Sequence, residues 1–226
     1  MHYNGVKAAK YMKKIGIRRL KYYIGTHAHA DHVGGAPAVL AAIPTEKVIV
    51  PHSGVSNMIR RKAETSKERA AVKKVRYKVL RNGGSIKLGD ARMQCIGPIR
   101  VRSYHTGSTD ENNNSLILRV TYGGNSLLLT GDATFEELHE VHKKHRKAMR
   151  VDVLKNPHHN GDFRGLYKWF RMKYVVVSTS NGSQPSGEML SRLKKLHAKV
   201  YNTSGRRNGH VLMVMDGENI EFHTTK

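Results

Sequence analysis

The apolar residues follow two different periods along the chain, and these predict alternating helices and strands. In the first third of the sequence, apolar positions three or four residues apart predict helices, whereas short continuous apolar runs predict buried strands. The predicted helices cover residues 4–16, 36–43 and 56–75, and the predicted strands cover residues 21–25 and 47–51. The helix over 56–75 is long and strongly basic.

Glycine-containing turns separate paired strand-like segments in the rest of the chain. Gly89 with Asp90, and Gly123 with Gly124, predict the turns of hairpins over residues 85–96 and 115–132. Helices are predicted over 135–149 and 188–198, further strands over 151–155 and 173–180, and a closing hairpin over 211–222. This mixture predicts an α/β fold in which helices cover sheets. Because neither a repeat nor a low-complexity linker interrupts it, we expect a single domain over residues 1–226.

The balance of charge narrows the class of partner. The chain has 40 Lys and Arg against 17 Asp and Glu, a formal net charge of +23. The first 25 residues contain seven Lys or Arg and no acid, and further basic blocks cover residues 60–62, 73–78 and 143–150. Each block alone is typical of a solvated helix face, but the scarcity of acids throughout favours an anionic polymer such as nucleic acid.

Other global features restrict the setting of the chain. Cys95 is the only cysteine, so no internal disulfide is possible. No apolar run approaches the roughly 20 residues of a membrane span, and no signal-peptide pattern is present. These absences favour the cytoplasm for the sequence as given, and leave an extracellular location open if the N-terminus is truncated.

The stretch THAHADHVGG, residues 26–35, carries the densest candidate chemistry. His27 and His29 are two residues apart, so both side chains point the same way at the end of a strand, whereas Asp31 and His32 can begin a helix. Imidazoles with a carboxylate are ligands of borderline metals, and the intervening alanines leave room for them to converge. The stretch therefore predicts a metal site, with two imidazoles for one ion and Asp31 with His32 for another.

The pattern His-x-His-x-Asp-His resembles the signature of the metallo-β-lactamase superfamily, which implies an αββα sandwich. The resemblance continues through ENNNSLILRVTYGGNSLLLTGDA and VDVLKNPHHNG, which are similar to the hydrolase domain of ComEC-type DNA-internalisation competence proteins and their stand-alone relatives. Members of the superfamily usually have about 50 to 60 residues before the signature, including an edge strand pair. We therefore expect the first N-terminal strands to be lacking, with the open edge completed by a longer chain or by another chain.

The resemblance also implies the remaining ligands. Asp132 in Thr-Gly-Asp corresponds to the carboxylate that bridges two metals, and either His158 or His159 supplies a further imidazole. The subgroup usually has His-His-Gly at that point, so the inserted Asn160 leaves the choice between the two histidines open. One further metal ligand is implied in the loop before the strand that begins the second hairpin. Its candidates are His105, Asp110, Asn112 and Asn114. We take Asp110 as a metal ligand and assign the catalytic role to Asp31, His32 and Asp132.

A further departure concerns Gln184, which precedes Pro185 where the subgroup often has a His-Pro pair. A glutamine can form a hydrogen bond at this position but cannot transfer a proton. We therefore expect the activity of this chain to be reduced or altered compared with that of relatives that have the histidine.

The implied ligands favour Zn²⁺ as the metal, with Mn²⁺ second. Because the fold is indifferent to the scissile bond, the charge decides the substrate, and we expect a dinuclear-metal-dependent phosphodiesterase, a DNA nuclease. Two alternatives remain open: a phosphoesterase for small substrates that resembles a phosphocholine esterase, and a catalytically weak nucleic-acid-binding protein.

Overall fold

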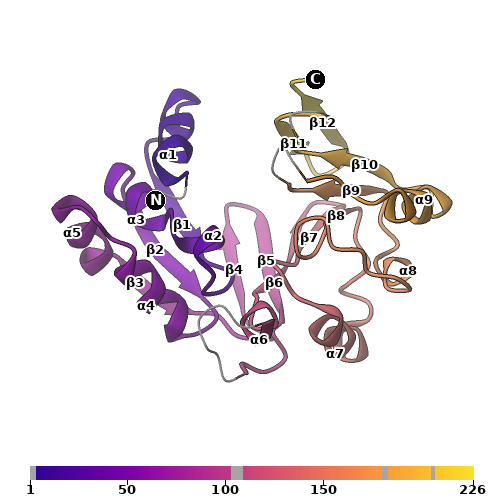
Figure 1. Cartoon of the computed structure of the whole chain (residues 1–226), viewed down its shortest axis with the longest axis horizontal. Coiled ribbons are helices and arrows are strands. Elements are labelled where there is room, and N and C mark those ends of the chain that lie inside the picture. Colours follow the sequence, from indigo (N-terminus) through magenta and orange to yellow (C-terminus); the bar gives the residue numbers. More distant parts are fainter. Residues whose placement is uncertain (1–3, 103–108, 180–182, 205–206) are drawn as a thin grey trace. The chain divides into compact units, whose positions relative to one another are not determined.

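The computed structural model describes residues 4–102, 109–179, 183–204 and 207–226. The chain folds as two units, each of which packs mainly on itself. The first unit comprises residues 1–81 and 100–116, and the second comprises residues 82–99 and 117–226. Each unit has its own sheet and its own helices (Figure 1).

The first unit is built on a parallel sheet of β1 (Leu20–Ile24), β2 (Thr45–Val50) and β3 (Arg76–Val79), in that order. Its helices are α1 (Gly5–Lys14), α2 (Ala30–Val33), α3 (Ala36–Ala42), α4 (Ser53–Arg61), α5 (Ser66–Lys74) and α6 (Thr109–Asn112). A buried cluster of β2 and helix side chains forms the core, with Val33, Val48, Val55 and Ile59 all fully buried. Helices with one apolar stripe thereby cover a short sheet whose central strand is buried.

The long helix predicted over residues 56–75 is wrong, because the structure has two helices there, α4 and α5. Thr65 accepts a hydrogen bond from the backbone N–H of Glu68, and the Glu68 carboxylate accepts one from the backbone N–H of Thr65. This reciprocal capping box starts a new helix inside the basic run. The run also ends in β3, a strand that the sequence reading did not anticipate.

The second unit contains a sheet of seven strands in the order β10-β9-β8-β7-β6-β5-β4. Its strands are β4 (Ser85–Leu88), β5 (Ala91–Gly97), β6 (Ile117–Tyr122), β7 (Asn125–Leu129), β8 (Val153–Lys155), β9 (Tyr174–Val177) and β10 (Lys199–Asn202). Strands β4 to β7 are antiparallel, as the predicted hairpins require, whereas β7 to β10 are parallel. The loops after β7, β8 and β9 therefore leave the same edge of the sheet, where ligands bind in open α/β sheets.

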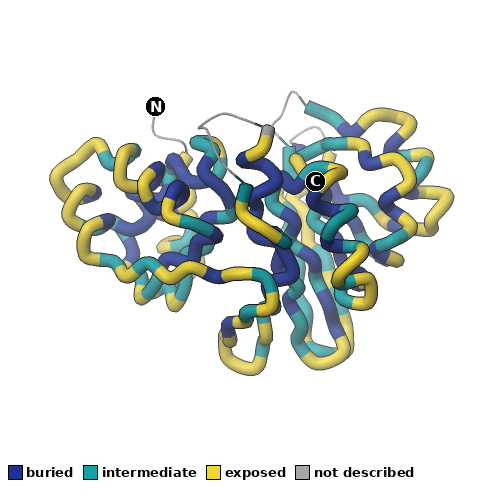
Figure 2. The backbone as a smooth tube through the Cα atoms, turned by 90° about the horizontal axis from the view of Figure 1, so that it is seen from below, coloured by how far each residue is buried: buried dark blue, intermediate teal, exposed yellow. Residues whose placement is uncertain are grey.

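Three helices and a separate hairpin complete the second unit. They are α7 (Phe135–His145), α8 (Tyr167–Phe170), α9 (Gly187–Lys195) and the predicted closing hairpin of β11 (Val211–Met215) with β12 (Ile220–Thr224). The core includes Leu128, Leu138, Leu154, Phe170 and Val175, all fully buried. Buried and exposed positions alternate along the helices around it (Figure 2). No helix among the described residues is both long and apolar enough to cross a membrane.

Candidate metal centre

The histidine motif of the first unit follows β1 directly. The β1 ladder continues to Gly25, whose N–H donates to the Ile49 carbonyl, and the Thr26 carbonyl then accepts from the Leu116 N–H. A Cβ on Gly25 would lie 2.9 Å from Val55 Cγ1 and 3.0 Å from Val33 Cγ1, so only glycine fits here. The glycine therefore lets side chains of α2 and α4 pack closely against the end of β1.

His27 and His29 bring two nitrogens together. His27 is fully buried, and its Nε2 lies 3.1 Å from His29 Nδ1. On its other side, His27 Nδ1 contacts the hydroxyls of Thr26 at 3.1 Å and Ser115 at 3.3 Å. His29 Nε2 is buried without a hydrogen-bond partner within the described part of the chain. The hydroxyls thus hold the His27 ring so that its Nε2 faces His29.

Asp31 and His32 lie on the short helix α2, which begins after His29. The His29 residue has extended backbone, φ −86° and ψ 146°, and its carbonyl accepts from the N–H groups of His32 and Val33. The His32 ring centroid is 4.2 Å from that of His27, and His32 Nε2 is 3.4 Å from Asp31 Oδ2. The first unit therefore gathers the predicted imidazoles and the predicted carboxylate of the motif.

Glu111 on α6 supports the backbone of the histidine motif, a role that the sequence did not predict. Its fully buried carboxylate accepts from the Ala28 N–H at 2.5 Å and lies 3.1 Å from His52 Nε2. Because the Gly54 N–H donates to His52 Nδ1, the proton of that ring is on Nε2 and is donated to Glu111. Burial by itself would raise the pKa of Glu111, but hydrogen bonds from His52, Asn114 and Ala28 outweigh it and hold the pKa below its usual range.

The candidates for the remaining ligand lie around Glu111. Asp110 is exposed, and Asn114 is fully buried with its amide donating to Glu111 at 2.9 Å and accepting from the Arg102 N–H at 2.7 Å. Asn112 Oδ1 is buried without a hydrogen-bond partner within the described part of the chain. His105 lies outside the described residues. Asn114 thus has a structural role, and the assignment of Asp110 as a ligand stays a prediction. In the sequence, only a few polar residues separate Glu111 from the apolar run of β6. This short separation is the sequence signal that Glu111 is buried.

Asp132 follows β7 in the second unit. Thr130 is fully buried and donates to the Lys155 carbonyl at 2.9 Å, and Gly131 then adopts a left-handed backbone with φ 54°. Asp132 is 3% exposed, and its Oδ2 lies 3.3 Å from His159 Nε2 and 4.0 Å from His158 Nε2. Burial lowers the pKa of Lys155, and the carboxylate of Asp132 opposes that effect. The Thr-Gly-Asp turn therefore points its carboxylate at the two adjacent histidines.

His159 has a defined proton arrangement. Its Nδ1 lies 3.3 Å from the Ser178 carbonyl, which can only accept, so Nδ1 carries a proton. A neutral His159 therefore turns a lone pair of Nε2 toward the Asp132 carboxylate. Two lone pairs 3.3 Å apart repel unless the ring takes a second proton or a cation binds between them. A carbonyl that fixes the tautomer in this way is the usual neighbour of a metal-binding histidine.

Asn156 shapes the loop that carries both histidines, and the sequence reading did not single it out. This fully buried side chain donates to the carbonyls of Pro157 at 3.1 Å, His159 at 3.0 Å and Gly161 at 3.0 Å. Its Oδ1 accepts from the Tyr167 hydroxyl at 3.1 Å. His158 and His159 have left-handed backbone, with φ 44° and 58°. The asparagine holds this strained turn, and an Asn-Pro pair after a buried strand is its sequence signal.

Gln184 is part of the neighbouring hydrogen-bond network. Its Nε2 donates to Ser204 Oγ at 2.6 Å, and its Oε1 accepts from Asn202 at 3.2 Å. The Asn160 amide donates to the Gln184 carbonyl at 3.0 Å and to Ser183 Oγ at 2.8 Å. Gln184 and the inserted Asn160 therefore tie the loop after β8 to the loops after β9 and β10.

The donor sets in each unit fit a metal ion. Two ligands of a tetrahedral ion with bonds of about 2.0–2.1 Å lie about 3.3 Å apart. The separation of 3.1 Å between His27 Nε2 and His29 Nδ1, and that of 3.3 Å between His159 Nε2 and Asp132 Oδ2, agree with this value. Imidazole and carboxylate donors also match the preference of Zn²⁺ and Mn²⁺.

An α/β fold with histidine and aspartate side chains gathered after its strands is typical of metal-dependent hydrolase domains, and the comparisons with known proteins identify the family. Residues 7–156 match the family described as "Beta-lactamase superfamily domain". The chain belongs to this superfamily. The resemblance inferred from His-x-His-x-Asp-His and the predicted α/β fold of the metallo-β-lactamase type are thereby confirmed.

A relative in Bacillus subtilis (strain 168) is more specific. The chain is 30% identical over 202 residues to the protein named "ComE operon protein 3", and the match covers 87% of this chain. It covers 25% of the relative, so the chain spans about a quarter of the length of that protein. The predicted resemblance to the competence group agrees with this finding.

Solved structures show the same fold. The metallo-β-lactamase fold protein YhfI from Bacillus subtilis has a TM-score of 0.53 at 10% identity, covering 86% of this chain and 79% of YhfI. Tm1679, titled a metal-dependent hydrolase of the β-lactamase superfamily, has a TM-score of 0.53 at 13% identity, covering 86% of this chain and 81% of its own. The diiron β-hydroxylase CmlA from Streptomyces venezuelae has a TM-score of 0.53 at 13% identity, covering 83% of this chain and 44% of CmlA.

Proposed function

We propose that the chain is a dinuclear-metal-dependent phosphodiesterase that acts on nucleic acid, with DNA as its substrate class. The observation that supports metal binding is the geometry of His159 against Asp132, and membership of the β-lactamase superfamily supports hydrolysis. A nitrogen lone pair facing a carboxylate calls for a proton or a metal ion between the two atoms, and the histidine motif offers a second set of such donors.

We assign the ligands as the superfamily resemblance implies, to a dinuclear centre. Asp31, His32, Asp132 and His159 each offer a ligand atom of the kind that borderline metals bind. His27 and His29 would hold one ion, Asp31 and His32 would hold the other, and Asp132 would contribute its carboxylate to the same centre. Of the two adjacent histidines, we choose His159 as the ligand, because its Nδ1 contacts the Ser178 carbonyl. Zn²⁺ is the first expectation and Mn²⁺ the second.

Metal ions held by these residues would supply an activated water and charge stabilisation for phosphoryl oxygens. The side chains around them orient the ligands: Glu111 fixes the backbone of the motif at Ala28, and Asn156 fixes the loop at His159. Catalysis of this kind needs no nucleophilic side chain, so Asp31, His32 and Asp132 serve by binding and orientation.

The charge of the chain supports a polymeric substrate. A net charge of +23 attracts a phosphodiester polymer through many phosphates at once, whereas a small substrate meets only a few of these cations. The relative named "ComE operon protein 3" agrees with this choice without determining it.

The test uses the full chain, loaded with Zn²⁺ or Mn²⁺ and assayed with and without a chelator. We expect two metal ions per chain by elemental analysis, and degradation of DNA that the chelator abolishes. Cleavage of bis-p-nitrophenyl phosphate with DNA left intact would overturn the choice of polymer in favour of a small phosphoester. Salt-sensitive DNA binding with no hydrolysis of either substrate would establish the binding protein instead.

A further inference from the structure

A row of rings lies along the surface of the second unit. Phe135 and His139 on α7 are nearly parallel, with centroids 5.9 Å apart and an interplanar angle of 14°. His142 stacks on Trp169 of α8 at 4.0 Å and 9°, and His139 lies 5.8 Å from the same indole. The spacing of four and three residues places the α7 rings on one face of the helix.

Packing accounts for only one end of this row. Trp169 is partly buried and packs against the core of the unit, so its stack with His142 covers apolar surface. Phe135 lies at the other end and is 52% exposed. An exposed phenyl ring beside a parallel imidazole leaves an apolar, flat surface in contact with solvent.

Exposed cations gather at the C-terminal end of α7, beyond the rings. The exposed basic residues of the end of α7 and the turn after it are Lys143, Lys144, Arg146, Lys147 and Arg150. No acid occurs between residues 141 and 151. Of the acids earlier on α7, Glu137 is buried and accepts from the Ile99 N–H at 2.7 Å, whereas Glu136 and Glu140 lie at the helix surface.

The cations act on the rings electrostatically. Burial lowers the pKa of His142, and the charges of Arg146, His139 and Arg150 lower it further. Guanidinium groups therefore lie within interaction range of the stacked rings. Flat rings and cations together are the combination that single-stranded nucleic acid binds, because bases stack on the rings while phosphates meet the charges.

We propose that this ring and cation face of α7 binds single-stranded nucleic acid, with an unpaired base stacking on Phe135. The proposal rests on the proposed phosphodiesterase function for its choice of polymer, and adds a preference for single strands. Phe135 begins the helix that follows Asp132, so a strand bound along this face leads toward a proposed metal ligand. Duplex bases are already stacked on one another and cannot use the ring in this way.

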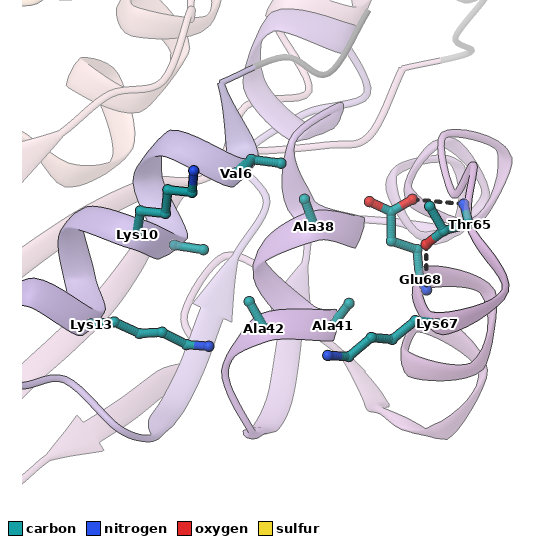
Figure 3. A pocket seen from close by; sticks show the side chains of 10 residues that line it. Val6, Lys10, Lys13, Ala38, Ala41, Ala42, Thr65, Lys67 and Glu68 are labelled. Carbon is teal, nitrogen blue, oxygen red and sulfur yellow. Dashed lines mark hydrogen bonds between the residues drawn. The ribbon is translucent and has the colours of Figure 1, made fainter.

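The first unit provides a second basic surface for comparison. A groove of about 300 Å³ between α1, α3 and α5 has an alanine floor. Lys10 and Lys13 of α1 and Lys67 of α5 border it, with Ala41 and Ala42 between them (Figure 3). The carboxylate of Glu68 at its margin is engaged with the N–H groups of Glu64 and Thr65.

The experiment measures fluorescence anisotropy of the full chain with a labelled oligo-dT and a duplex of equal length, in chelator so that no hydrolysis occurs. Phe135→Ala is expected to raise the Kd for the single strand about tenfold, the value of one lost stacking contact, and that for the duplex less than twofold. Phe135→Trp restores stacking and the single-strand affinity. Arg146→Ala with Arg150→Ala weakens both ligands and reduces the salt slope for the single strand by about 1.4. Lys10→Ala with Lys13→Ala is the charge control and affects both ligands equally.

Several outcomes would overturn the proposal. If Phe135→Ala binds the single strand as tightly as the parent chain, or loses affinity for both ligands equally, stacking on this ring is excluded. Preferential binding of anionic lipid vesicles over oligo-dT would identify the face as a membrane contact instead. Hydrolysis is measured separately with metal present. Loss of single-strand binding in Phe135→Ala, in a parent that cleaves no DNA, would leave this inference standing while the proposed function fails.

Discussion

The two histidine loops of this chain achieve similar donor pairs by different means. In the first unit, the motif runs from a strand into a helix with ordinary backbone, and His29 is extended at φ −86°. In the second unit, His158 and His159 have left-handed backbone, and the side chain of Asn156 holds their turn. The first loop is placed by secondary structure and the second by a buried amide. We therefore expect ligand changes to affect both loops strongly, and support changes to affect the second most.

The largest expected effect comes from removing a ligand of the first loop. His29→Ala takes away a nitrogen 3.1 Å from His27 Nε2 and leaves that set with one imidazole. We expect metal affinity and DNA hydrolysis to fall by more than the roughly 100-fold known for losses around metal ligands. Elemental analysis and a nuclease assay measure both. His223→Ala, an exposed histidine on β12, is the control and retains both properties. Full metal content in His29→Ala would remove this loop from the centre.

A second prediction separates the adjacent histidines of the other loop. Glycine favours the left-handed backbone of both positions, so His158→Gly and His159→Gly change the side chain without adding strain. We expect His159→Gly to lose metal affinity by roughly 100-fold, and His158→Gly to lose about threefold or less. Competition with a chromogenic chelator gives both affinities. The reverse order would assign the ligand to His158.

Asn156→Ala tests the support of the second loop. It leaves the carbonyls of Pro157 and His159 without this buried donor and that of Gly161 with the Tyr167 hydroxyl alone, which costs stability by about 2–4 kcal/mol. Metal affinity is expected to fall about 10-fold, because the turn no longer holds His159 in place. Tyr167→Phe removes only the hydroxyl, which lies 3.1 Å from both Asn156 Oδ1 and the Gly161 carbonyl, and costs about 1 kcal/mol. Denaturant unfolding and metal titration give the two quantities. An unchanged metal affinity in Asn156→Ala would show that the amide supports the fold and not the ligand.

The same contrast explains what the sequence could predict. The motif at residues 27–32 and the hairpins around Gly89 and Gly123 are local patterns, and the structure contains the hairpins where the pattern puts them. Glu111, by contrast, acts through a contact between residues far apart in the sequence, because it accepts a hydrogen bond from Ala28, 83 positions away. The role of Asn156 likewise depends on the folded loop. Local patterns cannot reveal such contacts.

The start of α5 was also not predicted, because the helical pattern of the surrounding residues is stronger than the capping signal. The basic periodicity over residues 56–75 continues through the break, while the break itself depends on one hydrogen-bond pair between Thr65 and Glu68. Thr-x-x-Glu was visible in the sequence as a capping box, but it lay inside a pattern that favours helix on both sides. The choice between His158 and His159 stays a prediction, and its basis, the contact of His159 Nδ1 with the Ser178 carbonyl, is a contact that sequence patterns do not show.

The smallest predicted effect concerns a carboxylate that supports the second unit away from the ligands. Asp152 accepts from the N–H of Ser126 at 3.0 Å and from its hydroxyl at 2.8 Å, and lies 3.1 Å from Lys173 Nζ. Burial by itself would raise the pKa of Asp152, but the hydrogen bonds from Ser126 and Lys173 and the charge of Lys173 hold it below its usual value. This group therefore stabilises the fold above the unfolded pKa of about 3.9, and the contribution is lost as the pH falls through the lower folded pKa.

Asp152→Asn is expected to cost about 1–2 kcal/mol at pH 7, because the amide keeps one acceptor but loses its charge. The difference from the parent chain should shrink as the pH falls below 4, since the parent then loses the same contribution. Urea unfolding at several pH values measures it. Metal affinity at pH 7 should stay within about twofold of the parent, because Asp152 joins the starts of β7 and β8 and the proposed ligands follow their ends. A loss of metal affinity as large as that of Asn156→Ala would show that the second loop depends on the stability of its whole unit. The difference between the two loops would then come from the units that carry them, and the turn held by Asn156 would not explain it.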